Sequence, residues 1–215
     1  MNIETKFGLF PRDHGGTRYA TARRALMQPH RRYHGITHIH RCLSYVEDRF
    51  LVDDNINCIE SLVDACVFHD IVYDSRPDKE FRSAIAYSCL VNNDRELFGC
   101  DKPPHAEWTY MTIKETIDHE FRGKDFYAGS MIRIDLADLS NPEMTARNYE
   151  LIKLESMGLY KVDEKTFAET NISFMNGLKE RVEKNREIDY MRYTDFWTDV
   201  LTGIDSTIEM SKAAL

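Results

Sequence analysis

Apolar residues recur at helical spacing along almost the whole chain, and this pattern limits the fold most strongly. Ile59, Leu62, Val63, Cys66 and Val67 follow one another as on one face of a helix. The alternation of apolar and polar residues that is typical of strands is nearly absent. We therefore expect an all-α fold, with helices at about 16–28, 36–51, 56–70, 79–97, 105–119, 142–157, 163–187 and 193–213.

Local signals mark where some of these helices begin and end. Asn141, Pro142 and Glu143 offer an N-cap, a proline that loses no hydrogen bond, and an acid near the positive end of the helix. Loops are indicated by the segments 75–78, 98–104 and 122–124, which are rich in Gly, Pro and charged residues.

Length and composition favour one ordinary domain. The 215 residues are 42% hydrophobic and 30% charged, with only 10 Gly and 6 Pro, which excludes a collagen-like or low-complexity chain. No internal repeat or flexible linker divides the sequence. We expect a single domain over residues 1–215.

We expect neither a membrane span nor export. Its apolar runs, such as residues 65–68, are far shorter than the roughly 20 residues that cross a bilayer. Residues 1–10 contain Glu4 and Lys6 and lack an apolar signal core. The cysteines are odd in number and form no close pair, so we expect reduced core thiols in a cytoplasmic protein; they are Cys42, Cys58, Cys66, Cys89 and Cys100.

Positive charge is concentrated near the N-terminus. The whole chain has a net charge of −8, but the segment from Arg12 to Arg41 holds seven Arg against one Asp, a local charge of +6. Five of the eight histidines lie within the first 40 residues. The segment favours binding of an anion, although an ordinary solvated basic helix has the same composition.

Three places could supply metal ligands. His34 and His38 are four residues apart, so on one helix their imidazoles would share a face, although surface or core histidines have the same spacing. His69 and Asp70 end an apolar helix, where a buried carboxylate needs a cation or several donors. The mostly apolar stretch 132–139 carries two more carboxylates, which could equally pair with Arg or cap the next helix.

In order and spacing these residues resemble the HD-domain superfamily of metal-dependent phosphohydrolases, and most closely a bacterial and phage branch of predicted HD phosphohydrolases. The resemblance spans about residues 19–155, leaving C-terminal helices over 160–215. Its motifs read here as Pro29 to His34 with His38, His69 to Asp74, Glu80 with Ser83 and Ala84, Thr116 to His119, and Ala137 to Leu139.

The resemblance implies a helical HD-domain bundle with a divalent metal bound by His38, His69, Asp70 and Asp138. Such a mixed site suits Mn, Mg, Co, Fe or Zn, so it does not name the metal. The branch often has Asp-Ala-Asp where this chain has Leu136-Ala137-Asp138. The choice between Asp138, which the motif register favours, and Asp135 therefore stays open.

Further roles follow from the same resemblance. Glu80 is the candidate that orients or deprotonates the attacking water, with Asp70 beside it, although Glu80 could also be a plain acid at a helix start. Lys79 stands where the branch often has Asn.

Substrate contacts are also implied. Arg31 and Arg32 are candidates for gripping phosphate, and His34 and His119 for extra ligands or phosphate donors. Tyr33 and Tyr73 flank the motifs, where they could stack on a base or pack in the core.

The expected activity is removal of phosphate from a nucleotide or a related small phosphomonoester by metal-activated water. A phosphodiesterase acting on a cyclic or oligonucleotide signal is the alternative enzyme, and a nucleotide-binding HD protein without turnover is the alternative outside enzymes. The net charge of −8 makes nucleic acid an unlikely partner, and a homo-oligomer stays open.

Overall fold

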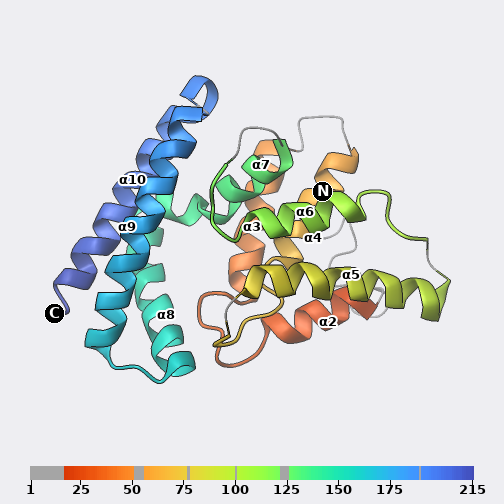
Figure 1. Cartoon of the computed structure of the whole chain (residues 1–215), viewed down its shortest axis with the longest axis horizontal. Coiled ribbons are helices and arrows are strands. Elements are labelled where there is room, and N and C mark those ends of the chain that lie inside the picture. Colours follow the sequence, from red (N-terminus) through yellow and green to blue (C-terminus); the bar gives the residue numbers. More distant parts are fainter. Residues whose placement is uncertain (1–16, 51–55, 77, 100, 122–125, 189) are drawn as a thin grey trace. The chain divides into compact units, whose positions relative to one another are not determined.

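The computed structural model describes residues 17–50, 56–76, 78–99, 101–121, 126–188 and 190–215. These residues form nine α-helices and one short 3₁₀ helix, with no strand among them, so the all-α prediction is confirmed for the described chain (Figure 1). The α-helices are α2 (Thr17–Leu26), α3 (Ile36–Phe50), α4 (Ile56–Phe68), α5 (Lys79–Phe98), α6 (Ala106–Glu115), α7 (Phe126–Asp135), α8 (Pro142–Tyr160), α9 (Glu164–Ile188) and α10 (Tyr190–Lys212). The 3₁₀ helix η1 covers Ala137–Ser140.

The start of α8 confirms its sequence signal. The Asn141 side chain caps the helix, accepting hydrogen bonds from the backbone N–H groups of Glu143 at 3.0 Å and Met144 at 3.2 Å. Pro142 occupies the first turn, where its missing N–H costs nothing. The cap and the proline fix the end of the segment that contains Asp135 and Asp138.

Two predictions about helices were wrong. No helix was predicted over Phe126–Asp135, but α7 lies there. Its residues 130–134 are all buried, so this stretch offers no exposed polar face that would reveal the helical period. The predicted helix 105–119 ends early, since α6 stops at Glu115 and His119 adopts a left-handed backbone conformation with a φ of 53°.

The chain divides into two compact units, Met1–Ile117 and Asp118–Leu215. The boundary falls inside the stretch that carries the family resemblance, and a single HD-type domain over residues 1–215 stays a prediction. In the first unit, α2 to α6 bury Leu26, Ile39, Leu43, Leu62, Cys66, Phe68, Tyr87 and Ile113. Helices α3 and α4 thus pack against each other through buried apolar side chains, and this packing holds their ends in place.

The second unit is built around the pairing of α9 with α10, which run side by side (Figure 1). Their apolar core includes Ile132, Leu136, Met175, Leu178, Val182, Trp197, Val200 and Ile204. Gly203 of α10 meets η1 at very close range, because a Cβ atom on it would lie 1.9 Å from the Leu139 carbonyl oxygen. The contact requires glycine and fixes η1 against α10.

The cysteines only partly follow the expectation of core thiols. Cys42 and Cys66 are free and buried, as predicted, but Cys89 is exposed and so is not a core thiol. Arg12, His14 and Cys100 lie outside the described residues, as do the predicted loop positions 77 and 122–124; the side chain of Cys58 is also undescribed.

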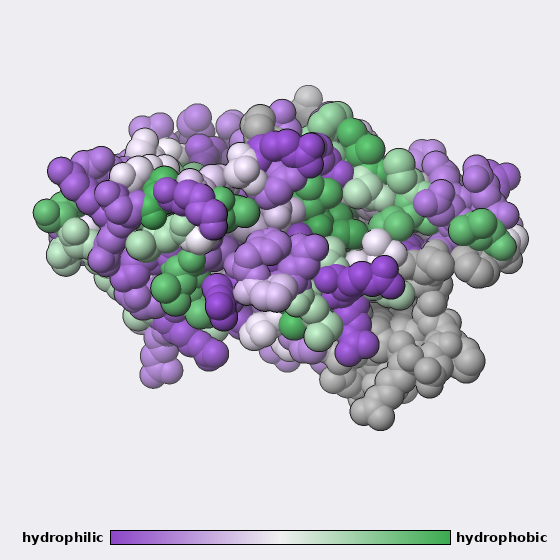
Figure 2. Space-filling model, turned by 90° about the horizontal axis from the view of Figure 1, so that it is seen from below, coloured by the Kyte–Doolittle hydropathy of each residue, from purple (hydrophilic) through white to green (hydrophobic). Residues whose placement is uncertain are grey.

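None of the described helices combines the length and apolar character needed to span a bilayer. The face shown in Figure 2 is mostly hydrophilic, with hydrophobic residues interspersed.

Candidate metal centre

His69 and Asp70 follow directly on the last turn of α4. The His69 N–H still donates to the Ala65 carbonyl at 2.9 Å, so the backbone leaves the helix only after this residue. Both side chains are buried, with exposed fractions of 1% for His69 and 6% for Asp70. The sequence therefore places an imidazole and a carboxylate together in an apolar environment, as predicted.

The hydrogen bonding of His69 fixes which of its nitrogens faces the carboxylate. Its Nδ1 lies 3.0 Å from the Cys66 carbonyl oxygen, which can only accept, so Nδ1 carries the proton. The lone pair is then on Nε2, which lies 3.2 Å from Oδ2 of Asp70. Two such electron-rich atoms repel one another at this distance unless a proton or a cation lies between or beside them.

His38 of α3 joins this pair. Its side chain is buried, its Nε2 lies 4.0 Å from Oδ2 of Asp70, and its ring centre is 5.5 Å from that of His69. The thiol of Cys42, one helical turn on, approaches His38 Nε2 at 3.6 Å. Within the first unit the structure thus holds a buried group of two histidines and one aspartate.

The spacing within this group suits a metal ion. Bonds of about 2.0–2.2 Å to N and O ligands at tetrahedral angles place ligand atoms about 3.3 Å apart. The distances of 3.2 Å and 4.0 Å from Asp70 Oδ2 to the two Nε2 atoms lie on either side of this value. Small side-chain movements would bring all three onto one ion.

The two carboxylates of the predicted distal motif lie in the second unit. Asp135 is the last residue of α7, and its Oδ2 lies 3.0 Å from Nε2 of His119. Asp138 lies in η1, where its Oδ2 accepts a hydrogen bond from Nδ2 of Asn148 at 3.0 Å. A metal-ligand role for either carboxylate stays a prediction.

Arg31 is a structural clamp at the edge of the group. Its guanidinium is buried and donates to the carbonyl oxygens of His34 at 3.1 Å, Asp70 at 2.5 Å and Ile71 at 2.8 Å. These bonds tie the segment before α3 to the segment after α4. The neighbouring Arg32 is exposed, so it is the better placed of the two to meet a phosphate from solvent.

His34 does not share a helix face with His38, because it lies two residues before α3 begins. Its ring stacks on Tyr73, with centres 4.5 Å apart and planes at 25°. Lys79 lies 4.3 Å from the centre of the Tyr73 ring, and Tyr33 meets His34 edge-on at 4.7 Å. These aromatic residues therefore pack beside the metal group.

Glu80 lies half-buried in the first turn of α5. The same helix is tied to the segment after Asp70, since the Val72 N–H donates to Ser83 Oγ at 3.0 Å. Asp74 fastens this segment further, because its carboxylate accepts from Arg82 at 2.7 Å and from Arg76 at 2.6 Å. The hydrogen bonds of Arg82, and then those of Arg76, hold the pKa of Asp74 well below its usual range.

Neither the family models nor the curated proteins nor the solved structures contain a match to this chain.

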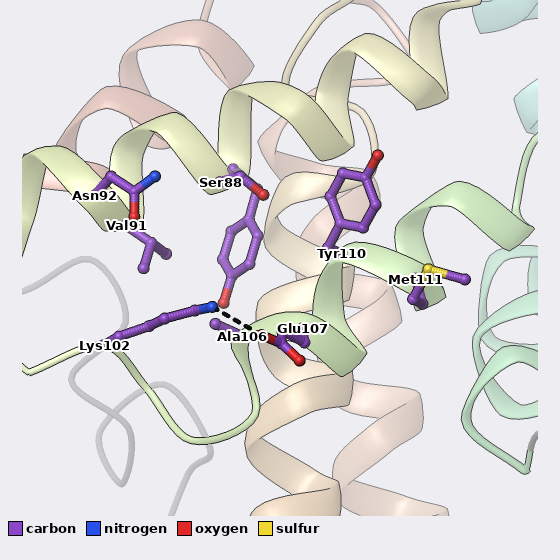
Figure 3. Close-up of a pocket in the computed structure, with 9 residues that line it drawn as sticks. Ser88, Val91, Asn92, Lys102, Ala106, Glu107, Tyr110 and Met111 are labelled. Carbon is purple, nitrogen blue, oxygen red and sulfur yellow. Dashed lines mark hydrogen bonds and ion pairs between the residues drawn. The ribbon is translucent and has the colours of Figure 1, made fainter.

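A separate pocket of about 450 Å³ opens between α5 and α6 (Figure 3). Its charged side chains, Lys102 and Glu107, pair with each other at 3.2 Å. Its inner wall includes Tyr87, whose hydroxyl donates to the buried Asp64 at 2.9 Å. Burial, and the nearby Asp64 charge, raise the pKa of Tyr87, which keeps the hydroxyl a donor. None of the predicted site residues lines this pocket.

Sequence reasoning missed several contacts of the metal group. The approach of Cys42 to His38 and the Cys66 carbonyl beside His69 follow helical spacings of four and three residues, so both could have been found. The ion pairs of Asp74 join residues up to eight positions apart across a turn and carry no periodic signal.

Proposed function

We propose that the protein is a metal-dependent phosphohydrolase. The observation that carries this proposal is the buried contact between His69 Nε2 and Asp70 Oδ2 at 3.2 Å, next to His38. Such a pair needs a proton or a cation beside it, and divalent cations are the usual partners of a set of two imidazoles and a carboxylate. The motif order described above favours phosphoester chemistry over other uses of a metal.

The residues present fit a divalent ion. Imidazole nitrogens from His38 and His69 and the carboxylate of Asp70 would hold it. When bound, such an ion supplies positive charge that promotes ionisation of water and offsets the charge of phosphoryl oxygens. The donor set of nitrogen and oxygen accommodates Mn, Mg, Co, Fe or Zn.

The chain's own residues prepare the site. The hydrogen bond from His69 Nδ1 to the Cys66 carbonyl holds the imidazole in the tautomer whose Nε2 is a ligand. Arg31 binds the Asp70 carbonyl and so fixes the backbone that carries the carboxylate. Both contacts are made before any ion arrives, which lowers the conformational cost of binding.

Glu80 is proposed to accept the proton of the attacking water. It comes from the first turn of α5, the helix that Ser83 connects to the segment following Asp70. A carboxylate that is half exposed can exchange this proton with solvent after each turnover.

The proposed substrate is a small phosphomonoester such as a nucleotide. Arg32 is exposed next to the buried Arg31, and Lys79 lies beside Tyr73, so cationic side chains are available near the metal group. Arg32 can grip phosphate oxygens in pairs, and His34 can donate one further hydrogen bond.

The experiment is a hydrolysis screen of protein purified without chelator, in Mn²⁺, Mg²⁺ and Co²⁺, against nucleoside mono-, di- and triphosphates, cyclic nucleotides and simple phosphate esters. We expect release of phosphate from monoesters. Hydrolysis of cyclic nucleotides alone would replace the monoesterase by a phosphodiesterase. Nucleotide binding without turnover would contradict the enzyme.

The variant Glu80→Gln tests the role of Glu80 in proton transfer. We expect kcat to fall by about 10²–10⁴-fold with little change in metal affinity, because only proton transfer is removed. Glu143→Gln is the control, since Glu143 is also an acid in the first turn of a helix but is exposed at the start of α8. A normal rate in Glu80→Gln would make Glu80 a helix-start acid, and loss of metal would make it a ligand.

A further inference from the structure

The turn that precedes α3 holds His34 by its backbone. The Gly35 N–H donates to the Tyr33 carbonyl at 2.8 Å, and the buried Arg31 guanidinium donates to the His34 carbonyl at 3.1 Å. A Cβ atom on residue 35 would lie 3.0 Å from the Leu26 carbonyl oxygen, a close approach that favours glycine. The turn therefore fixes the point from which the His34 side chain leaves the backbone.

The direction of the His34 side chain is set by Tyr73, which lies in the segment after α4. The two rings are stacked, with centres 4.5 Å apart and planes at 25°, and Tyr33 meets His34 edge-on at 4.7 Å. A stacked imidazole keeps both nitrogens at the edge of its ring, where they can form hydrogen bonds. The stack with Tyr73 therefore decides where the nitrogens of His34 point.

Tyr73 is itself firmly held. Its exposed fraction is 7%, Nζ of Lys79 lies over its ring at 4.3 Å from the centre, and the guanidinium carbon of Arg31 lies 5.4 Å from that centre. Cations over an aromatic ring are attracted by its negative face. A ring that is so fully covered serves as a support for His34 rather than as a stacking platform for a base.

His34 borders the metal group and is partly open to solvent. Its ring centre lies 6.1 Å from that of His38, one of the proposed ligands. His34 is half-buried, whereas His38 is buried. An imidazole in this position, held by a stack and not by the metal, can offer an N–H to an anion that reaches the metal group from solvent.

We propose that Tyr73 is a positioning residue for substrate binding, which acts by directing a nitrogen of His34 toward the phosphoryl group of the substrate. The inference rests on the proposed function, because it assumes that a phosphate ester binds at the metal group. Tyr73, His34 and their neighbours Arg31, Tyr33 and Lys79 all lie within the first unit.

Calorimetric titration of inorganic phosphate into Mn²⁺-saturated protein tests the proposal. Tyr73→Leu removes the stacked ring and should weaken phosphate binding by about 10-fold, the equivalent of one hydrogen bond to an anion. Tyr73→Phe keeps the ring and should bind phosphate as tightly as the wild type. Mn²⁺ affinity should stay the same in both variants, because His34 is not a proposed ligand. Equal phosphate affinity in Tyr73→Leu and the wild type would overturn the proposal.

Two further variants separate positioning from general damage. Phe167→Leu removes another buried ring, which packs on Tyr149 in the second unit with ring centres 5.9 Å apart, and it should keep the phosphate affinity. In protein that already carries His34→Ala, adding Tyr73→Leu should cause no further loss, because both changes break one chain of contacts. A loss in Phe167→Leu, or additive losses, would overturn the positioning role. If Tyr73→Leu fails to fold, Tyr73→Met fills the space more flexibly, and the same result is expected.

A second readout depends on neither metal nor phosphate. Protons over the face of an aromatic ring are shielded, so the ring-proton NMR signals of His34, assigned with His34→Ala, should move downfield in Tyr73→Leu and stay in place in Tyr73→Phe. Unchanged His34 signals in Tyr73→Leu would overturn the positioning role. Absence of Mn²⁺ binding in the wild type, with the NMR result as expected, would instead defeat the proposed function.

Discussion

Nε2 of His69 lies 3.2 Å from Oδ2 of Asp70, the next residue in the chain. Neighbouring residues in the middle of a helix point about 100° apart, so this contact depends on the end of α4 at Phe68. The Cys66 carbonyl then selects the tautomer of His69 that turns a lone pair toward Asp70. The helix end and its last turn together create the electron-rich site from which the proposed metal chemistry follows.

Arg31→Ala should destabilise the protein strongly even though it lies outside the proposed ligands. It removes hydrogen bonds to three carbonyl groups, two of them in the segment after α4. We expect a loss of about 2–4 kcal/mol in the free energy of unfolding, measured by urea denaturation. Arg32→Ala, at the exposed neighbouring position, should stay within about 0.5 kcal/mol of wild type. Equal effects would show that the clamp contributes nothing.

Asp138→Asn should reduce metal affinity far more than Asp135→Asn, as the register of the Ala137 to Leu139 motif implies. Asparagine keeps the shape of the side chain and removes its charge, so the difference reports metal binding rather than packing. Both carboxylates also accept a hydrogen bond, Asp138 from Asn148 and Asp135 from His119, so the loss of such a bond does not by itself distinguish the variants. Titration with Mn²⁺ measures both affinities. The opposite ranking would make Asp135 the distal ligand.

Asp74→Asn should lower stability at neutral pH, and by less in acid. The pKa of Asp74 is held well below its usual range by Arg82 and Arg76, so the charged carboxylate stabilises the folded state above the ordinary aspartate pKa. This contribution starts to decrease as the pH drops below about 4, where the unfolded state takes up the proton first, and it is lost only as the pH falls through the lower pKa of the folded state. The difference in urea midpoint between variant and wild type should therefore be smaller at pH 3 than at pH 7. A constant difference would exclude the ion pairs as its cause.

Gly203→Ala should disrupt the second unit. The added Cβ atom would lie 1.9 Å from the Leu139 carbonyl oxygen, so α10 and η1 must move apart, at a cost of about 1–3 kcal/mol or more. Gly158→Ala in α8 is the matched control, because nothing lies within 4 Å of its added Cβ atom. The control should stabilise the protein by about 0.5–1 kcal/mol. Thermal unfolding followed by circular dichroism distinguishes the two, and a stable Gly203→Ala would refute the close contact.

The sequence predicted the helices whose apolar face is balanced by a polar one, together with the cap at Asn141, because both signals are local. It did not predict α7, since residues 130–134 are buried on every side and leave no period. It left open whether His34 and His38 share a helix, and they do not, because α3 begins at Ile36. Helix ends are set by a few hydrogen bonds that many sequences can make, so their positions were the least predictable part of the fold.

At the candidate site, the apolar surroundings of His69 and Asp70 singled these two residues out in the sequence, whereas His38 joined them only through the resemblance to the HD-domain superfamily. It could not predict the two hydrogen bonds that join the Asn185 side chain to the backbone at His119 and Phe121, because these residues are more than 60 positions apart in the chain. It also could not separate Asp135 from Asp138, because both carboxylates lie in the same apolar stretch and only their partners differ.

The most direct test of a metal centre is calorimetric titration of Mn²⁺ into metal-free protein for the wild type, His69→Ala, Asp70→Asn and the control His40→Ala. His40 lies on α3, two residues from His38, but is exposed. We expect the wild type and His40→Ala to bind Mn²⁺ with equal affinity, and the other two variants to lose more than about 100-fold while keeping their helical circular dichroism. A wild type that binds no Mn²⁺, Zn²⁺ or Co²⁺, or variants that bind as tightly as the wild type, would contradict the metal centre.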